Sequence, residues 1–172
     1  MDVQVRPAVG NEFSLSTCQI DFCLPMRFNL TYIDSDGSKK TPVVLHRAIF
    51  GSIDRTIAYY LEETRGVLPL WLAPNQINII PVNLEYHLEY SYKLMDLLMD
   101  NGFRVSVDDR DEKLSYKMRD SQTKKIPYTL IIGDKELEDG SISYRLHGFK
   151  DTVNVNKNDF IELLKNRIKD YK

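Results

Sequence analysis

Residues 42–55 read Pro-Val-Val-Leu-His-Arg-Ala-Ile-Phe-Gly-Ser-Ile-Asp-Arg. An extended apolar segment comes first, a small Gly51-Ser52 turn follows, and a charged pair ends the stretch. Apolar residues then recur at helical spacing, at Ile53, Ile57, Tyr60 and Leu61. Ser52 stands where it can cap the helix, and Gly66 where it can end it. The stretch therefore predicts a strand that turns sharply into a helix.

Upstream of this stretch, short β-rich segments alternate with turn signals. The segments 2–7 and 11–17 flank Val-Gly-Asn at 9–11, which predicts a hairpin. Later strands are expected over 19–22, 28–33 and 39–45, with a turn at Asp-Ser-Asp-Gly, residues 34–37. Residues 1–50 are therefore expected to form an antiparallel sheet.

Downstream, Pro69 and Pro74 bracket a stiff apolar connector, and strands then alternate with helices. Strands are predicted over 77–82, 103–107, 128–132 and 141–146. One helix is predicted with Leu88, Tyr92, Met95 and Met99 on one face. Others are predicted over 112–124 and 157–171, and a short turn or helix around Lys135. This alternation is typical of an α/β domain with a mixed sheet flanked by helices.

The composition is that of an ordinary globular protein, with 172 residues, 42% hydrophobic and 28% charged. No apolar run reaches the roughly 18 residues that a membrane span needs, and the start lacks the features of a signal peptide, so a cytoplasmic protein is expected. The net charge of −2 gives no overall attraction to nucleic acid, so RNA binding would need a local basic patch. Cys18 and Cys23 are interpreted as two buried, reduced thiols.

Residues 46–55 resemble the third signature motif of class II aminoacyl-tRNA synthetases, in the form that threonyl-tRNA synthetases have, with Asp54 in place of the usual glutamate. Residues 70–74, Leu-Trp-Leu-Ala-Pro, resemble the start of that family's anticodon-binding domain, and the resemblance continues to Lys172. It implies a C-terminal fragment of such an enzyme. Residues 1–66 would be a truncated antiparallel sheet plus helix from the class II catalytic core, and residues 67–172 the anticodon-binding domain.

The resemblance assigns a chemical role to several residues of the first part. In the parent enzyme, a threonine–tRNA ligase, ATP and threonine give threonyl-adenylate and the threonyl group then moves to tRNA. Arg55 matches the arginine that contacts the ATP phosphates, and Gln19 and Ser52 match residues beside the substrate pocket and the adenylate. From pattern alone, Arg55 could instead form a surface ion pair, Gln19 could be a sheet-facing polar residue and Ser52 an N-cap.

His46 matches the last of three zinc ligands in the family, the other two lying upstream of this chain. A zinc site needs about three protein ligands, so zinc is expected in the parent enzyme and not on the fragment. Without the resemblance, a lone histidine on a strand reads as a hydrogen-bonded interior residue. The fragment is also expected to be catalytically inactive, because the arginine of the second class II motif is missing as well.

The densest basic stretch lies between residues 113 and 125, with cations at Lys113, Lys117, Arg119, Lys124 and Lys125. Their spacing forms no single stripe, so a solvated polar face is the alternative to an RNA-binding surface. The resemblance implies that this helix and the next two strands read the anticodon. Arg119, Glu136 and Arg145 match base-reading positions of the family. Lys125 stands where many members have arginine, and Asp111 where asparagine is usual. Glu136 could accept a hydrogen bond from guanine while the arginines donate to bases or stack on them.

The expected partners are a threonine tRNA and, in the parent, threonine and ATP, with no membrane, no DNA and no family dimer. One alternative is a free-standing, non-catalytic tRNA-binding or regulatory module derived from a synthetase. Another is a relative of the histidyl, prolyl or glycyl type, against which His46 before the Gly-Ser turn argues. Unpaired strand edges in residues 1–50 predict local disorder or association through those edges.

Overall fold

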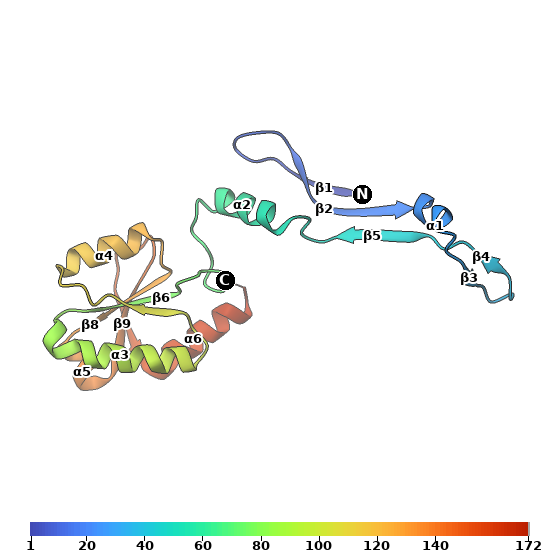
Figure 1. The fold of residues 1–172 in the computed structure, drawn as a ribbon. Helices are drawn as coiled ribbons and strands as arrows, with labels where there is room; N and C mark the ends of the chain where they lie inside the picture. Colours follow the sequence, from blue (N-terminus) through green and yellow to red (C-terminus); the bar gives the residue numbers. More distant parts are fainter. Residues whose placement is uncertain (172) are drawn as a thin grey trace. The chain divides into compact units, whose positions relative to one another are not determined.

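The computed structural model describes residues 1–171 (Figure 1). The chain folds into two compact units, one spanning Met1–Gly66 and the other beginning at Val67. None of the helices within residues 1–171 combines the length and the apolar character needed to cross a bilayer.

The first unit is built on a three-stranded antiparallel sheet. Its strands are β1 (Asp2–Val5), β2 (Phe13–Asp21) and β5 (Val44–Ala48), in the order β1-β2-β5. The other elements are α1 (Cys23–Arg27), the two-residue strands β3 (Tyr32–Ile33) and β4 (Lys39–Lys40), and α2 (Ile53–Glu63). The hairpin before residue 20, the turn at 34–37 and the helix after Gly51 are confirmed.

Three local predictions for this unit are wrong. The strand expected over 39–45 is divided between β4 and β5, with residues 41–43 in neither. The segment expected to be a strand over 28–33 is extended only at its end, because α1 and the turn after it occupy the chain up to there. Cys23 is exposed and not buried, since it begins α1, where its backbone N–H donates to Asp21 Oδ1 at 2.7 Å. Cys18, on β2, is half-buried.

Gly51 is required by a close approach between β2 and the turn before α2. Its φ of +55° lies in the left-handed region, and a Cβ atom built there would lie 2.9 Å from the carbonyl oxygen of Leu15. Only glycine has this freedom without a steric cost. The turn therefore brings Ser52 and the start of α2 close to the sheet.

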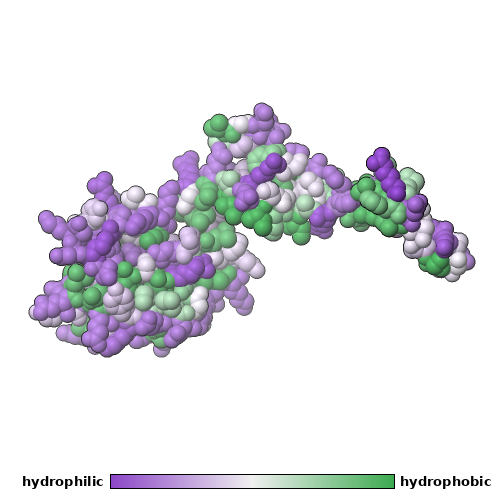
Figure 2. Space-filling model, in the orientation of Figure 1, coloured by the Kyte–Doolittle hydropathy of each residue, from purple (hydrophilic) through white to green (hydrophobic). Residues whose placement is uncertain are grey.

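The first unit has almost no hydrophobic core. Pro25 is the only buried residue within Met1–Gly66, and large apolar side chains such as Ile20, Leu45 and Phe50 are more than half exposed. Figure 2 shows hydrophobic side chains on the open surface of this unit. Neither β1 nor β5 has a second strand neighbour, so both present unpaired edges among the described residues.

The second unit is a five-stranded mixed sheet in the order β10-β9-β8-β6-β7. Its strands are β6 (Ile77–Pro81), β7 (Val105–Val107), β8 (Tyr128–Ile132), β9 (Ser141–Leu146) and β10 (Val153–Asn156). β6 runs parallel to β7 and β8, whereas β9 is antiparallel to β8 and β10. The mixed sheet predicted from the alternation is confirmed, and β10 is the one strand that the pattern missed.

Helices flank the sheet on two sides. They are α3 (Leu84–Asp100), α4 (Leu114–Thr123), α5 (Asp134–Asp139) and α6 (Lys157–Lys169). Leu94 and Leu98 of α3 and Phe160 and Leu164 of α6 join the main core with the apolar residues of β6, β8 and β9. Figure 1 shows α4 on the other side of the sheet from α3 and α6.

The face of α3 that is buried differs from the predicted one. His87, Ser91, Leu94 and Leu98 are buried, whereas Tyr92 and Met99 are exposed. Two polar residues can lie inside because they are hydrogen-bonded, and His87 Nε2 also lies 3.0 Å from Asp134 Oδ1. The Asn83 N–H donates to His87 Nδ1 at 3.1 Å, and Ser91 Oγ donates to the His87 carbonyl at 2.8 Å.

Candidate nucleic-acid interface

Strand β9 carries a polar row on the side of the sheet where α4 lies. Ser143 and Arg145 share this side because alternate residues of an extended chain point the same way, and His147 follows in the turn after the strand. Arg145 lies opposite Thr129 of β8, and the buried Thr129 Oγ1 is 2.6 Å from Ser121 Oγ of α4. The hydroxyl contact therefore shows that the side chains of Thr129 and Arg145 lie on the face of the sheet where α4 lies. The alternate residues of β9, such as Tyr144, enter the core on the opposite face.

The turn after β9 is tied directly to α4. The Gly148 N–H donates to Gln122 Oε1 at 3.0 Å, and the Arg145 guanidinium donates to Thr152 Oγ1 at 3.3 Å. Three buried polar atoms of this region have no hydrogen-bond partner among the residues described: Gln122 Nε2, Arg145 Nε and His147 Nδ1. The end of β9 and the last turns of α4 thus form one half-buried polar surface. Residue pattern alone gave no signal for Gln122.

Glu136, predicted to read a base, is only 7% exposed. It stands at the third position of α5, where its Oε2 accepts from the Gly133 N–H at 3.0 Å and its Oε1 accepts from Ser143 Oγ at 2.5 Å. The carboxylate therefore ties the start of α5 to the polar row of β9. Its contact with a base stays a prediction.

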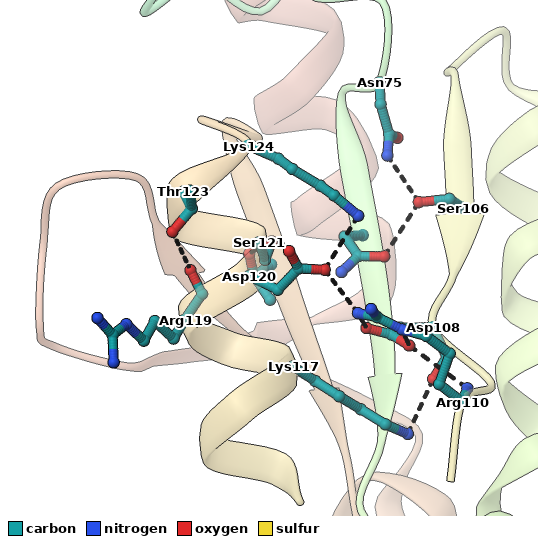
Figure 3. Close-up of polar contacts among 12 residues, drawn as sticks. Asn75, Ser106, Asp108, Arg110, Lys117, Arg119, Asp120, Ser121, Thr123 and Lys124 are labelled. Carbon is teal, nitrogen blue, oxygen red and sulfur yellow. Dashed lines mark hydrogen bonds and ion pairs between the residues drawn. The ribbon is translucent and has the colours of Figure 1, made fainter. Parts of the chain in front are cut away.

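Arg110 organises the connection between β7 and α4 (Figure 3). Its guanidinium donates to both oxygens of Asp108, at 2.8 and 2.6 Å, and to Asp120 Oδ2 of α4 at 2.6 Å. The Arg110 hydrogen bond holds the pKa of the largely buried Asp108 below its ordinary value. Lys124 and then Arg110 lower the pKa of Asp120 in the same way. These bonds fix the loop that carries Asp111 to α4.

The basic stretch does not act as a single patch. Lys117 is 2% exposed, and its Nζ donates to the Asp108 carbonyl oxygen at 3.0 Å. Lys124 Nζ lies 3.0 Å from Asp120 Oδ2. Arg119, by contrast, is exposed, and Figure 3 shows its side chain pointing away from the ion pairs of Arg110. The alternative of a solvated polar face therefore does not hold for Lys117, which is buried.

The five predicted RNA-contacting residues fall into two groups. Asp111 lies in the exposed loop before α4, Arg119 on α4, and Lys125 in a left-handed conformation directly after it. Glu136 lies on α5 and Arg145 on β9. Ser143 of β9 donates a hydrogen bond to Glu136 and so links the two elements. Both groups belong to the same unit.

In the first unit, the structure brings Gln19 and His46 together. They are directly opposite each other on β2 and β5, and His46 Nε2 lies 3.1 Å from Asp21 Oδ2. The Asp21 pKa is lowered, chiefly because its carboxylate accepts the Leu24 N–H and further because of the Cys23 N–H and His46. The described residues contain no group of three or more potential metal ligands, so His46 and its neighbours do not by themselves fit a zinc site.

Ser52 and Arg55 lie at the start of α2. Ser52 occupies the N-cap position, but its side chain makes no capping hydrogen bond; instead Thr56 Oγ1 donates to the Phe50 carbonyl at 2.7 Å. Arg55 is exposed and borders a hollow of about 480 Å³ that Phe13, Tyr59 and Glu62 also line. The surface ion pair weighed for Arg55 is not found among the described residues.

Comparison with known proteins places both units in tRNA synthetases. Residues 76–167 match the family described as Anticodon binding domain, and residues 2–64 match the tRNA synthetase class II core domain (G, H, P, S and T). The Threonine–tRNA ligase of Listeria welshimeri is 52% identical and that of Staphylococcus aureus 49% identical, each over 94% of this chain and 25% of the relative.

The structural comparison agrees. The crystal structure of the RNA binding domain of threonyl-tRNA synthetase from Cryptosporidium parvum Iowa II superposes with a TM-score of 0.87 and 32% identity, over 96% of this chain and 42% of that chain. This chain spans about a quarter of the length of the curated relatives that it matches. The chain therefore belongs to the threonyl-tRNA synthetase family and carries a segment of the class II core followed by an anticodon-binding domain.

Proposed function

We propose that the unit beginning at Val67 binds the anticodon loop of a threonine tRNA and that the chain serves a threonine–tRNA ligase. The polar row of β9 beside α4 carries this proposal, because it presents Arg145, with an Nε unpaired among the described residues, on the face of the sheet where α4 lies. The named function of the relatives and the RNA-binding neighbour in Cryptosporidium support it. Anticodon bases are unpaired, so their edges are open to donors such as Arg145.

The charge distribution suits a local contact with RNA. The whole chain is slightly acidic, and three cations in and around α4, Arg110, Lys117 and Lys124, are already paired inside the protein. Arg119 is exposed on α4 and is therefore proposed to contact phosphate, whereas the half-buried Arg145 is proposed to contact a base. Phosphate contacts make binding depend on salt, and base contacts make it depend on sequence.

The binding test uses the whole chain and two RNA stem-loops, one with a threonine anticodon and one altered at the second anticodon base. Dissociation constants from fluorescence anisotropy should differ, and Arg145→Ala should reduce the difference by about tenfold, since one good base contact is worth about 1–3 kcal/mol. Arg27→Ala, an exposed arginine of α1 in the first unit, is the matched control. Equal affinity of the unaltered chain for both RNAs would contradict the proposal.

For the first unit, we propose the roles that the family resemblance implies. Arg55 would contact ATP phosphates, with Gln19 and Ser52 near the adenylate. His46 would supply one zinc ligand only if the other ligands came from outside these residues. The chain by itself is proposed not to form threonyl-adenylate, because the exposed surface around β2 and β5 is not a closed, preorganised site. Threonine-dependent pyrophosphate exchange above background would contradict this.

The second candidate is a tRNA-binding or regulatory module without catalysis. It is favoured by the contrast between the units, because the anticodon-binding unit has its own core and the class II segment has almost none. Both candidates predict the same RNA contacts. They differ when the exchange assay is repeated with the remaining class II core added, since only a ligase would then gain activity.

A further inference from the structure

We propose that Gln122 is an additional specificity-determining residue, whose side-chain amide nitrogen donates a hydrogen bond to an acceptor on one unpaired base of the loop. The inference rests on the proposed function, because the ligand is the same RNA. It adds a neutral donor from α4 to the charged donor that Arg145 supplies from β9.

The orientation of the Gln122 amide is set by a neighbour that can only donate. The Gly148 backbone N–H lies 3.0 Å from Gln122 Oε1, so the oxygen end of the amide must face that turn. The nitrogen end, with its two hydrogens, therefore points elsewhere. Gln122 Nε2 is buried and has no partner among residues 1–171. Native proteins keep few buried donors unpaired, and such a donor suggests a ligand that completes the bond.

Two other side chains of this region also have polar atoms left unpaired in the described part of the chain. Arg145 Nε and His147 Nδ1 are also buried without a hydrogen-bond partner among the described residues. Arg145 leaves β9 on the side where α4 lies, and His147 is the first residue of the turn after β9. The Gly148 contact joins that turn to Gln122. The unpaired atoms of Gln122 and Arg145 therefore lie on the same side of the sheet.

The two fixed donors in this place define the ligand's chemistry. Gln122 Nε2 and Arg145 Nε both present N–H groups, so the ligand must offer acceptors such as a keto oxygen or a ring nitrogen. A neutral, half-buried amide suits the edge of a base that has left its stack. A phosphate of the same RNA would offer acceptors too, and the experiment separates the two.

The test is a thermodynamic cycle between the side chain and the RNA. Threonine anticodon stem-loops are made with one loop nucleotide at a time abasic, which removes the base and keeps the phosphate. Each is bound to the unaltered chain, to Gln122→Met, which removes the amide, and to Gln122→Glu, which keeps an oxygen for Gly148 but has no donor. Thr123→Glu, exposed on the same helix, controls for the added charge.

At one loop position, the abasic change should weaken binding of the unaltered chain about three- to tenfold more than it weakens binding of either Gln122 variant, the range that one net hydrogen bond is worth. Thr123→Glu should respond as the unaltered chain does. If Gln122 only holds the turn at Gly148, Gln122→Glu will behave like the unaltered chain, and this outcome overturns the inference.

Absence of coupling at every loop position would overturn it as well, including the case in which Gln122 meets only a phosphate. Failure of the proposed function looks different, because the unaltered chain would then not distinguish the threonine anticodon loop from the one altered at its second base.

Discussion

Glu136 has a structural role that does not depend on any contact with a base. Both of its oxygens accept hydrogen bonds, one from the Gly133 backbone and one from Ser143, which also accepts from Asn154 Nδ2 at 3.0 Å. Removing the side chain would leave a donor at the start of α5 without a partner. The base contact predicted for Glu136 would therefore come in addition to a structural role.

Two substitutions separate these tasks. Glu136→Ala should lower the free energy of unfolding by about 1–3 kcal/mol, because buried donors lose their acceptor. Glu136→Gln should recover most of that loss, since an amide can accept from the Gly133 N–H and donate to Ser143 Oγ. Urea unfolding measures both.

The same pair tests RNA reading by Glu136. If the carboxylate accepts from a base, Glu136→Gln will bind the threonine anticodon stem-loop more weakly although its stability is nearly normal. Unchanged binding by this variant would leave Glu136 with the structural task alone.

At the scale of elements, the link between β7 and α4 depends on a few buried or half-buried charges. Arg110 bridges Asp108 at the end of β7 to Asp120 on α4, and its guanidinium carbon lies 5.7 Å from the centre of the Tyr116 ring. Lys117 adds a bond to the backbone of Asp108. The position of the Asp111 loop is therefore coupled to the ionisation of two aspartates.

This coupling predicts a dependence of stability on pH. The folded-state pKa values of Asp108 and Asp120 are depressed, so their stabilising effect is complete above the ordinary aspartate pKa and is lost as the pH falls through the depressed values. The free energy of unfolding should therefore decrease below about pH 4. Arg110→Met should flatten this decrease, whereas Arg119→Met should not. Urea unfolding at a series of pH values measures it, and parallel curves for all three proteins would contradict the coupling.

Strong hydrophobic periodicity was sufficient to predict most elements of the second unit, and local polar contacts explain the failures. β8 and β9 were predicted with their observed bounds because each is a short β-rich run between turn signals. The buried face of α3 was misplaced because His87 and Ser91 look like surface residues until their hydrogen bonds are known. β10 is four residues long and passes directly into α6, which leaves no separate signal.

For the candidate site, sequence reasoning found residues by resemblance and could not find their partners. Arg119 and Arg145 were named from the family match, yet nothing in the spacing shows that Lys117 turns inward to a carbonyl. Gln122 was missed because the sequence does not show that Gly148, in a distant turn, hydrogen-bonds the oxygen of the Gln122 amide. Only this contact reveals that the amide nitrogen faces elsewhere.

At the scale of the molecule, the two units differ in how they are stabilised. The second unit buries residues such as Ile77, Leu98 and Phe160 completely or nearly so, whereas the first buries only Pro25 among its residues. Burial of apolar area is the main source of folding free energy. Cooperative stability should therefore reside in the second unit.

A chain beginning at Val67 is accordingly expected to unfold at the same urea midpoint as the whole chain. It should also be monomeric by light scattering, whereas the whole chain should associate through the apolar surface and open strand edges of the first unit. A clearly lower midpoint for the shorter chain, or a whole chain that stays monomeric, would contradict this contrast.

The alternation along β9 places a polar row next to a core row on one strand. Tyr144 and Leu146 belong to the core or pack against it, whereas Ser143 and Arg145 leave the strand on the side of α4. A slip of a single residue against β8 would exchange the two rows, placing a guanidinium among aromatic rings and a tyrosine on the proposed RNA-binding face. Insertions or deletions within this strand should therefore disturb the core and the proposed contact together, so a change in base preference is expected from substitutions that keep its length.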